Sequence, residues 1–383
     1  MRLFSVFRKS LREQMRSIWM LVLTLIIASF FVILYWLITG GGSTTYNVLI
    51  INNDAGTNLA GGEQAIKAIE GMDYANGQPI LKVVQVPDRA SAEVKLRNRE
   101  VAALIIIPQD FSQALLTARQ ADKPTTSSVI MVGDLTNPYY TMVAVITVTA
   151  IDNYVQRTVG QVRPVEFKEE PMGGSAARTE FETYVPALLV LSVVMLIFQA
   201  AMTVAREVEG GTLRRLQLTR MTSFDLLGGI CATQVLIGVA SVVLTFLTAS
   251  ALGFHSQGPL WVAILVGAVT SLSIVGVGLI VACFARTVSE AFIYANFPLI
   301  LLMFFTGAVF PIPPIPLFTL GGHTIALFDF LPPTHAVVAL NKVLTLGTGI
   351  TDISYELTAL FLLSMLYFAA GVWLFKRMHL TTR

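Results

Sequence analysis

Long uncharged apolar runs alternate with short polar segments over most of the chain. The first run covers Ile18–Thr39, and the later ones lie at Val185–Val204, Leu226–Leu252, Leu260–Ala285, Ala291–Phe310 and Leu357–Phe375. Each run is close to the ~20 residues with which a helix crosses the hydrocarbon of a bilayer. None contains Asp, Glu, Lys or Arg, each of which costs roughly 2.5–3.5 kcal/mol at the centre of a span. The pattern predicts an α-helical integral membrane protein with six transmembrane helices.

Residues 40–183, between the first two runs, have a different pattern. Short β-branched runs bounded by Gly, Pro, Asn or Asp predict strands at Tyr46–Asn52, Ile80–Val86, Val101–Ile107 and Ser128–Val132. Helical apolar spacing separates these runs, at Glu63–Glu70, Arg89–Arg99 and Asp110–Arg119, and a longer helix is expected over about 138–162. This order predicts an inserted α/β domain whose mixed or parallel sheet carries helices on its faces.

Residues 1–17 combine basic and apolar side chains at helical spacing, and the basic ones are Arg2, Arg8, Lys9, Arg12 and Arg16. We expect an amphipathic helix that lies on the anionic cytoplasmic leaflet. A cleavable signal peptide has a similar basic start, but its apolar region is only about 7–15 residues long. The longer run at 18–39 therefore favours an uncleaved first span.

The basic residues of the short connections predict the orientation. They fall in residues 1–17, in Arg206–Arg220, at Arg286 and in the C-terminal tail, whereas the opposite short loops hold only Lys342. The positive-inside rule then places both termini in the cytoplasm, so the α/β domain is expected to be extracytoplasmic.

The connection at 311–352 is rich in proline and in apolar residues. Repeated prolines prevent one continuous helix, and segments this apolar are not expected to lie free in water. We expect short helices at Thr324–Leu331 and Ala336–Leu344 that dip into the outer leaflet in a re-entrant manner.

Composition excludes several classes of function. The chain has 383 residues, is 54% hydrophobic and has a net charge of only +2, which gives no reason to expect a nucleic acid partner. No Gly-Lys pair occurs, so a P-loop is absent from the sequence, and the four histidines and two cysteines lack metal or catalytic spacing. The spans also lack the ionisable residue expected of an ion-coupled carrier. We expect no catalytic site, metal or bound cofactor.

A few uncharged groups within the spans can make specific contacts. Gln199, Gln234 and Asn296 are expected to bridge neighbouring helices by hydrogen bonds, with contact to a translocated molecule as the alternative. The pair Gly276 and Gly278 is expected to mark a close helix contact, in preference to a dinucleotide-binding turn.

The link at Ala205–Thr222 concentrates charge between two spans. Gly210 and Gly211 can end the helix of the second span or bend the chain. Thr212 can then cap a short helix over 212–220, and Thr222-x-x-Asp225 has the pattern of a capping box that starts the third span. The alternative is a solvated basic loop.

A family resemblance distinguishes these alternatives. Arg206–Leu216 contains E-x-E-x-G-T-L-x-x-L, which resembles the signature of ABC-2 type transporter permeases. Val48–Gly56 and Val101–Phe111 are similar to the outer domain that the exporter branch of this family carries between spans one and two. Phe310–Pro316 and Phe330–His335 resemble its loop between spans five and six.

The resemblance implies a function and partners. The short helix would dock on a separate ATP-binding cassette ATPase, which would bind the ATP and Mg while this chain acts as a non-catalytic subunit. The ATPase-coupling residues would be Arg206, Glu207, Glu209, Gly211, Thr212, Leu213, Leu216 and Arg220. A second permease copy, identical or a paralogue, would complete the transporter in the cell membrane, in contact with membrane lipids.

The expected cargo is an amphipathic, drug-like or lipid-like molecule that leaves the cytoplasm or the inner leaflet. Candidate residues of its path are Phe198, Gln199, Phe292 and Asn296. The alternative function is a membrane-anchored receptor or scaffold whose α/β domain binds a ligand or partner. Six spans with a structured inner link favour transport.

Overall fold

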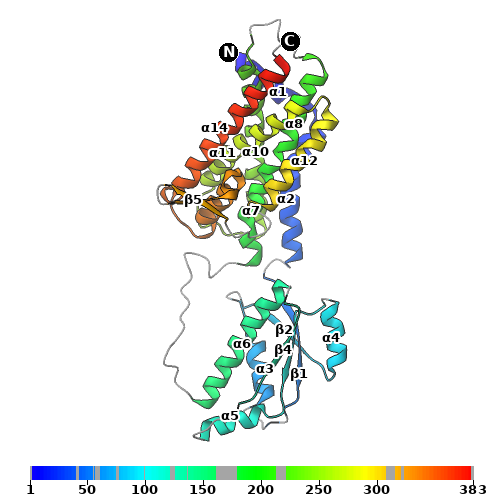
Figure 1. Ribbon diagram of the computed structural model, residues 1–383, viewed down its shortest axis with the longest axis vertical. Helices are drawn as coiled ribbons and strands as arrows, with labels where there is room; N and C mark the ends of the chain where they lie inside the picture. Colours follow the sequence, from blue (N-terminus) through cyan, green and yellow to red (C-terminus); the bar gives the residue numbers. More distant parts are fainter. Residues whose placement is uncertain are drawn as a thin grey trace. The chain divides into compact units, whose positions relative to one another are not determined.

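The chain folds into two compact units. The computed structural model describes all residues except 1, 40–42, 55, 57–60, 75–76, 99, 121–125, 136, 161–178, 213–220, 308–314, 321–322 and 381–383. A helical unit combines Met1–Gly42 with Pro171–Arg383, and a second unit comprises Ser43–Glu170. Figure 1 labels the elements of both units, which are described separately below.

The helical unit contains the predicted spans. Its longer helices are α1 (Arg2–Arg16), α2 (Ile18–Ile38), α7 (Glu180–Val194), α8 (Leu196–Glu209), α10 (Ser223–Ala251), α11 (Leu260–Phe284), α12 (Val288–Phe304) and α14 (Ser354–Phe375). Among the described residues, five helices are long and apolar enough to cross a membrane, with α7 and α8 acting as one helix of 30 residues. The remaining predicted span corresponds to α12, which has 17 residues. The count of six spans therefore stays a prediction.

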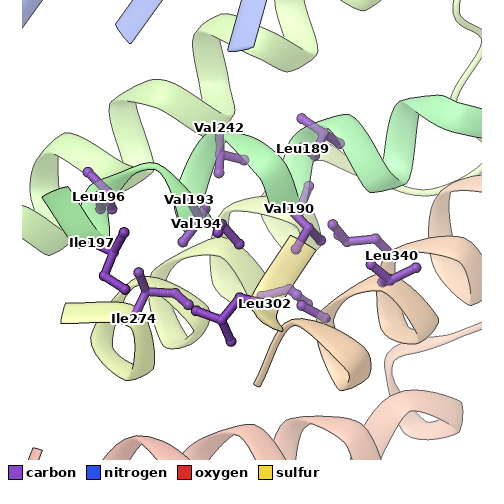
Figure 2. Packing of buried hydrophobic residues seen from close by; sticks show 14 of the residues in the cluster. Leu189, Val190, Val193, Val194, Leu196, Ile197, Val242, Ile274, Leu302 and Leu340 are labelled. Atoms are coloured by element: carbon purple, nitrogen blue, oxygen red, sulfur yellow. The ribbon is translucent and has the colours of Figure 1, made fainter. Parts of the chain in front are cut away.

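Helix α11 packs against α8, α10 and α14. The apolar core around it includes Leu196 and Ile197 of α8, Val242 of α10 and Ile274 of α11, which converge in Figure 2. Glycines of α11 permit close approaches to its neighbours, among them Gly267, whose Cβ atom would lie 2.7 Å from Val242 Cγ2 of α10.

Gly276 and Gly278 face different neighbours of α11. A Cβ atom at Gly276 would lie 2.8 Å from the backbone nitrogen of Phe368 in α14, and one at Gly278 would lie 2.7 Å from the Cβ of Ala200 in α8. No larger side chain fits at such separations without moving a helix. The prediction of a close helix contact at this pair is confirmed.

The second unit is built on a four-stranded mixed sheet. Its strands are β1 (Tyr46–Asn52), β2 (Leu81–Gln85), β3 (Ala103–Ile107) and β4 (Ile130–Val132). Their order is β2-β1-β3-β4, with β1 parallel to both neighbours and β4 antiparallel to β3. Each strand lies within two residues of its predicted bounds at either end, because β-branched runs between turn residues mark strands strongly.

Helices cover both faces of this sheet. They are α3 (Gly62–Glu70), α4 (Arg89–Arg97), α5 (Phe111–Gln120) and α6 (Pro138–Val159). Val48 and Ile50 of β1 share a core with residues of α3, α5 and α6, whereas Leu49 and Ile51 pack on the side of α4 with Ala92. This alternation follows from the two-residue period of a strand.

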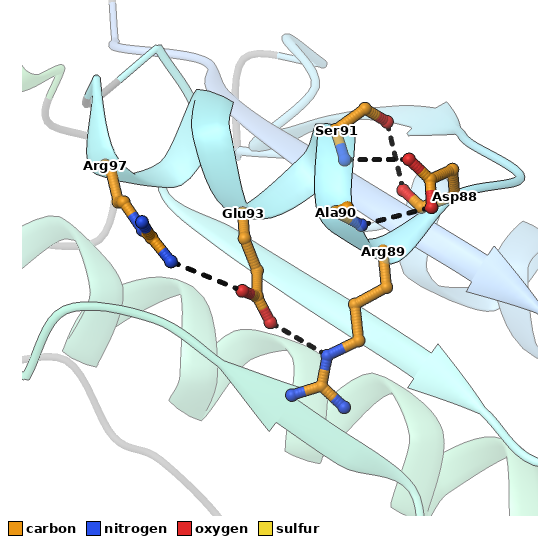
Figure 3. Close-up of polar contacts among 6 residues, drawn as sticks. All are labelled: Asp88, Arg89, Ala90, Ser91, Glu93 and Arg97. Atoms are coloured by element: carbon orange, nitrogen blue, oxygen red, sulfur yellow. Dashed lines mark hydrogen bonds and ion pairs between the residues drawn. The ribbon is translucent and has the colours of Figure 1, made fainter.

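Local polar contacts fix the ends of α4 (Figure 3). The Asp88 carboxylate accepts hydrogen bonds from the amides of Ser91, at 2.9 Å, and Ala90, at 3.2 Å. These two amides hold the pKa of Asp88 below its ordinary value. Glu93 lies between Arg89, at 2.8 Å, and Arg97, at 3.7 Å, one helical turn away on either side.

The connection between α12 and α14 differs in part from the prediction. The predicted helix at Thr324–Leu331 is wrong, because β5 (Pro316–Leu320) and β6 (His323–Ala326) form an antiparallel hairpin that is followed by a 3₁₀ turn, η2 (Leu327–Phe330). Thr324 pairs with Thr319 across this hairpin, and β-branched residues favour such pairs.

The second helix predicted in this connection is present. It corresponds to α13 (Pro332–Leu340) and the turn η3 (Asn341–Thr345). Ala336, Ala339 and Leu344 are fully buried, and α13 packs against α7, α11 and α14. The apolar side chains of α13 and η3 are thus buried against other helices of the same unit.

Candidate functional site at the end of helix α8

Helix α8 ends in a glycine bend. The amide of Gly210 donates to the carbonyl of Arg206 at 2.9 Å, and the amide of Gly211 donates to that of Val208 at 3.1 Å. Gly211 has φ of +64°, in the left-handed region that side chains disfavour and glycine adopts readily. The bend predicted at this glycine pair is confirmed.

Glu207 links α8 to α1. Its Oε1 accepts a hydrogen bond from Lys9 Nζ at 2.7 Å, and its side chain is only 11% exposed. Burial alone would lower the pKa of Lys9, but the hydrogen bond and negative charge of Glu207, together with those of Glu13, outweigh it and raise that pKa. The charged pair therefore joins α1 and α8 through two residues that are 198 positions apart in the sequence.

Glu209 links α8 to α12. Its Oε2 accepts the amide hydrogen of Val288 at 2.9 Å, and Val288 is the first residue of α12. The first amides of a helix lack partners within the helix and carry its positive dipole end, so a carboxylate is favourable there. Thr287 caps the same end through its hydroxyl, which accepts from the amide of Glu290 at 3.2 Å.

The remaining predicted coupling residues lie on both sides of the bend. The Arg206 guanidinium is 3.8 Å from Met20 Sδ of α2, and Thr212 is the last described residue before the gap at 213–220. Leu213, Leu216 and Arg220 thus lie outside the described residues, so the short docking helix stays a prediction. The chain is described again from Met221.

The predicted capping box at the start of α10 is confirmed. The Thr222 hydroxyl accepts from the amide of Asp225 at 3.1 Å, and the Asp225 carboxylate accepts from the amide of Thr222 at 3.0 Å. The connection between the second and third long helices therefore begins at a defined bend and ends at a defined cap.

Comparison with known families identifies the class of protein. The family model for the ABC-2 family transporter protein matches residues 15–373. The chain belongs to this family. It is thus an ABC-2 type permease, a transmembrane subunit of an ABC transporter, as the resemblance in Arg206–Leu216 suggested. A comparison with curated proteins gave no match.

The permease brings together two of its predicted path residues. The rings of Phe198 in α8 and Phe292 in α12 have centroids 5.0 Å apart, and Phe292 is 49% exposed. Next to Phe198, Gln199 donates through Nε2 to the carbonyl of Met20 in α2 at 3.5 Å. Its Oε1 is buried and has no hydrogen-bond partner within the described part of the chain.

The three polar residues of the spans behave differently from one another. Gln199 bridges α8 and α2, and Gln234 of α10 donates to the hydroxyl of Thr203 in α8 at 3.4 Å, both as predicted. The prediction is wrong for Asn296, whose amide donates to the carbonyl of Phe292 in its own helix at 2.8 Å. The side chain of an asparagine within a helix can donate its hydrogen bond to the backbone carbonyl one turn earlier in the same helix.

An apolar cavity lies between α2, α7 and α12. Its volume is about 170 Å³, and the rings of Tyr35 and Tyr184 at its wall are 4.7 Å apart. Leu188 and Leu191 of α7 and Leu302 of α12 also line it. Helix α12 thus carries two of the predicted path residues and also forms part of the cavity wall.

Two partners of the α8 end could not be found from the sequence. Lys9 belongs to a basic segment in which no pattern distinguishes it, and the partner of Glu209 is a backbone amide. The local sequence indicates only that a helix begins near Val288, because Thr287-x-x-Glu290 has the spacing of a capping box. Within the described ranges, no three His, Cys, Asp or Glu side chains gather to hold a metal ion.

Proposed function

We propose that this permease is the transmembrane subunit of an ATP-driven exporter. A separate ATP-binding cassette ATPase would supply ATP, Mg and hydrolysis, and a second permease copy would complete the path. The cargo would be amphipathic, drug-like or lipid-like, and it would leave the cytoplasm or the inner leaflet across the cell membrane. The α/β unit would be extracytoplasmic, with both termini in the cytoplasm.

The end of α8 is the observation that carries this proposal. Glu207 and Glu209 bind α1 and α12 immediately before the glycine bend, and the segment after the bend carries the family's docking signature. A displacement of that segment by an ATPase would act on α8 at the point where three helices are joined. These contacts suit a transmission point, whereas a solvated loop has no need of them.

The cargo path is proposed along the strip where α2, α7, α8 and α12 meet. Phe198 lies in the first turn of α8 and contacts Phe292 near the start of α12, and the cavity beside Tyr35 and Tyr184 is lined by α2, α7 and α12. Apolar walls with a few polar groups are typical of sites for amphipathic molecules. Oε1 of Gln199, which has no hydrogen-bond partner among the described residues, can accept a hydrogen bond from such a molecule.

The coupling role is tested with isosteric changes. Glu207→Gln/Glu209→Gln should leave membrane insertion and ATP hydrolysis by the co-purified native ATPase intact, but should reduce dye export in proteoliposomes at least about tenfold, because the charged contacts of α8 are lost. The control Glu63→Gln/Glu70→Gln removes the same charge from exposed positions of α3. Unchanged export per ATP in the α8 variant would refute the coupling role.

A further inference from the structure

Helix α1 presents a row of arginines on the side that faces away from the protein. Arg8, Arg12 and Arg16 are all exposed and follow one another at four-residue intervals. The buried residues Val6, Ser10 and Gln14 have the same interval but are offset by two positions, which is about 200° around a helix. The packing of α1 against α10 therefore leaves the arginine row uncovered by the described residues.

The row is held in place by the opposite face of α1. A Cβ atom at Gly229 of α10 would lie 2.6 Å from the Cβ of Val6, so the two helices are in close contact there. Gln14 donates to the hydroxyl of Thr203 at 3.2 Å, and Lys9 binds Glu207. The arginine row therefore has a fixed orientation relative to α8 and α10, whereas a helix bound only to a membrane can rotate relative to the rest of the protein.

No described carboxylate neutralises this row. Lys9, next to the row, forms the ion pairs with Glu13, at 3.6 Å, and with Glu207, and no ion pair of Arg8, Arg12 or Arg16 is found among the described residues. An open groove of about 480 Å³ runs along the row and is lined by Ser5, Arg8, Lys9, Arg12, Glu13 and Arg16. Guanidinium groups in such a groove match phosphate, to which arginine can donate two parallel hydrogen bonds.

Two observations place this groove at the surface of a bilayer. Phe4 and Met15 are each 65% exposed and lie beside Arg8 on the helix, at roughly 40° and 20° from it by helical geometry. Helix α2 begins at Ile18, two residues after Arg16, and Trp19 is 84% exposed. An apolar strip next to a basic row is typical of a helix at the headgroup level.

We propose that Arg8, Arg12 and Arg16 form a binding site for the phosphate headgroup of an anionic phospholipid, with Phe4 and Met15 against its acyl region. This goes beyond a general attraction of a basic helix to the membrane, because the packed face of α1 fixes the row relative to α8 and α10. Lipid binding at this site depends on neither the ATPase nor the direction of transport. An experiment that refutes the lipid site therefore leaves the proposed export function untouched, and the reverse also holds.

The test compares two lipids that differ only in headgroup. The full-length protein in neutral detergent is mixed with equal amounts of phosphatidylglycerol and phosphatidylcholine of the same acyl chains, and the bound lipids are counted by native mass spectrometry. Each arginine near the surface contributes roughly a fivefold preference for anionic lipid. Arg8→Gln/Arg12→Gln/Arg16→Gln should therefore lower the preference for phosphatidylglycerol at least about tenfold.

The control Lys82→Gln/Arg89→Gln/Arg97→Gln removes the same charge from exposed positions of the second unit and should leave the preference unchanged. Soluble glycerol phosphate should not displace the lipid, since the acyl contacts are part of the site. Spin-labelled lipids in bilayers give a second readout if the α1 variant is unstable in detergent. Equal binding of both lipids by the native protein, retained preference in the α1 variant, or displacement by glycerol phosphate would each overturn the proposal.

Discussion

The ion pair between Lys9 and Glu207 should contribute measurably to the stability of the helical unit. Exposed pairs are worth about 0.2–1 kcal/mol, whereas breaking a fully buried pair costs about 3–5 kcal/mol. Here the Glu207 side chain is 11% exposed and that of Lys9 is 45% exposed, so solvent screens the lysine. We expect a coupling free energy of about 1 kcal/mol, and a cost of about 1–2 kcal/mol for Lys9→Met, which leaves Glu207 without its cation.

A double-mutant cycle measures this coupling. The free energy of unfolding of the native protein, Lys9→Met, Glu207→Gln and the double variant is measured by circular dichroism in mixed micelles with increasing SDS. The cycle on Arg89 and Glu93 of α4, an exposed pair one turn apart (Figure 3), is the control and should give about 0.3–0.5 kcal/mol. A Lys9–Glu207 coupling no larger than that of the control would refute the reasoning.

The pH dependence of the same coupling has a defined sign. Burial lowers the pKa of Lys9, but Glu207 and Glu13 together raise it more, so the pKa of Lys9 in the folded protein lies above its ordinary value. A group whose pKa is raised by folding stabilises the protein fully below its unfolded pKa and loses that contribution as pH rises through the folded pKa. The coupling should therefore be constant between about pH 6 and 9 and decline only at more alkaline pH.

Three further predictions concern packing, the α/β unit and export. Gly276→Val should destabilise the helical unit by about 1–3 kcal/mol in the same unfolding assay, because the new side chain meets the backbone of α14. Gly228→Ala should cost far less, because the nearest atom to its Cβ is the end of the flexible Leu3 side chain, at 3.1 Å. The Asp54 carboxylate accepts hydrogen bonds from the amide of Gly62, at 2.7 Å, and from the amide and hydroxyl of Ser112. Asp54→Ala should therefore destabilise the second unit by about 2–3 kcal/mol. Limited proteolysis should cleave this unit faster in the variant than in the native protein, and an unchanged rate of cleavage would contradict the prediction. Replacing residues 43–170 with a short linker should leave the helical unit inserted, since it has its own core, but should abolish export; full export would show that the unit is accessory.

Local sequence patterns predicted the elements of the α/β unit well. Val48–Ile51 form a β-branched and leucine run followed by Asn52 and Asn53, and the structure ends β1 at Asn52. The connection between α12 and α14 was predicted less well, because Thr324 and Ile325 are apolar enough for a membrane-dipping helix but pair as a strand with a segment nearby. Which partner a short apolar segment finds is decided by tertiary contacts, and propensity is too weak to determine it.

The candidate site was predicted in part. Glu207, Glu209 and the glycine bend follow from local chemistry and from the family signature. Their partners do not, because Lys9 is almost 200 positions away and Val288 contributes only its backbone. Contacts of this kind depend on how the helices pack, which periodicity alone cannot specify.

The buried carboxylates of the helical unit lie at the ends of its uncharged helices. On the side opposite the end of α8, Glu182 at the start of α7 accepts the amide of His255 at 2.9 Å, and Glu356 at the start of α14 binds Lys342 at 2.7 Å. Both glutamates are 4% exposed. Charged contacts thus join helices at both ends of the bundle, whereas its middle is held by apolar packing and by uncharged hydrogen bonds such as that from Gln234 to Thr203. Because the charged contacts are at the ends, we expect a force on the end of α8 to shift the joined helices as rigid bodies, while the mainly apolar middle can repack at small cost.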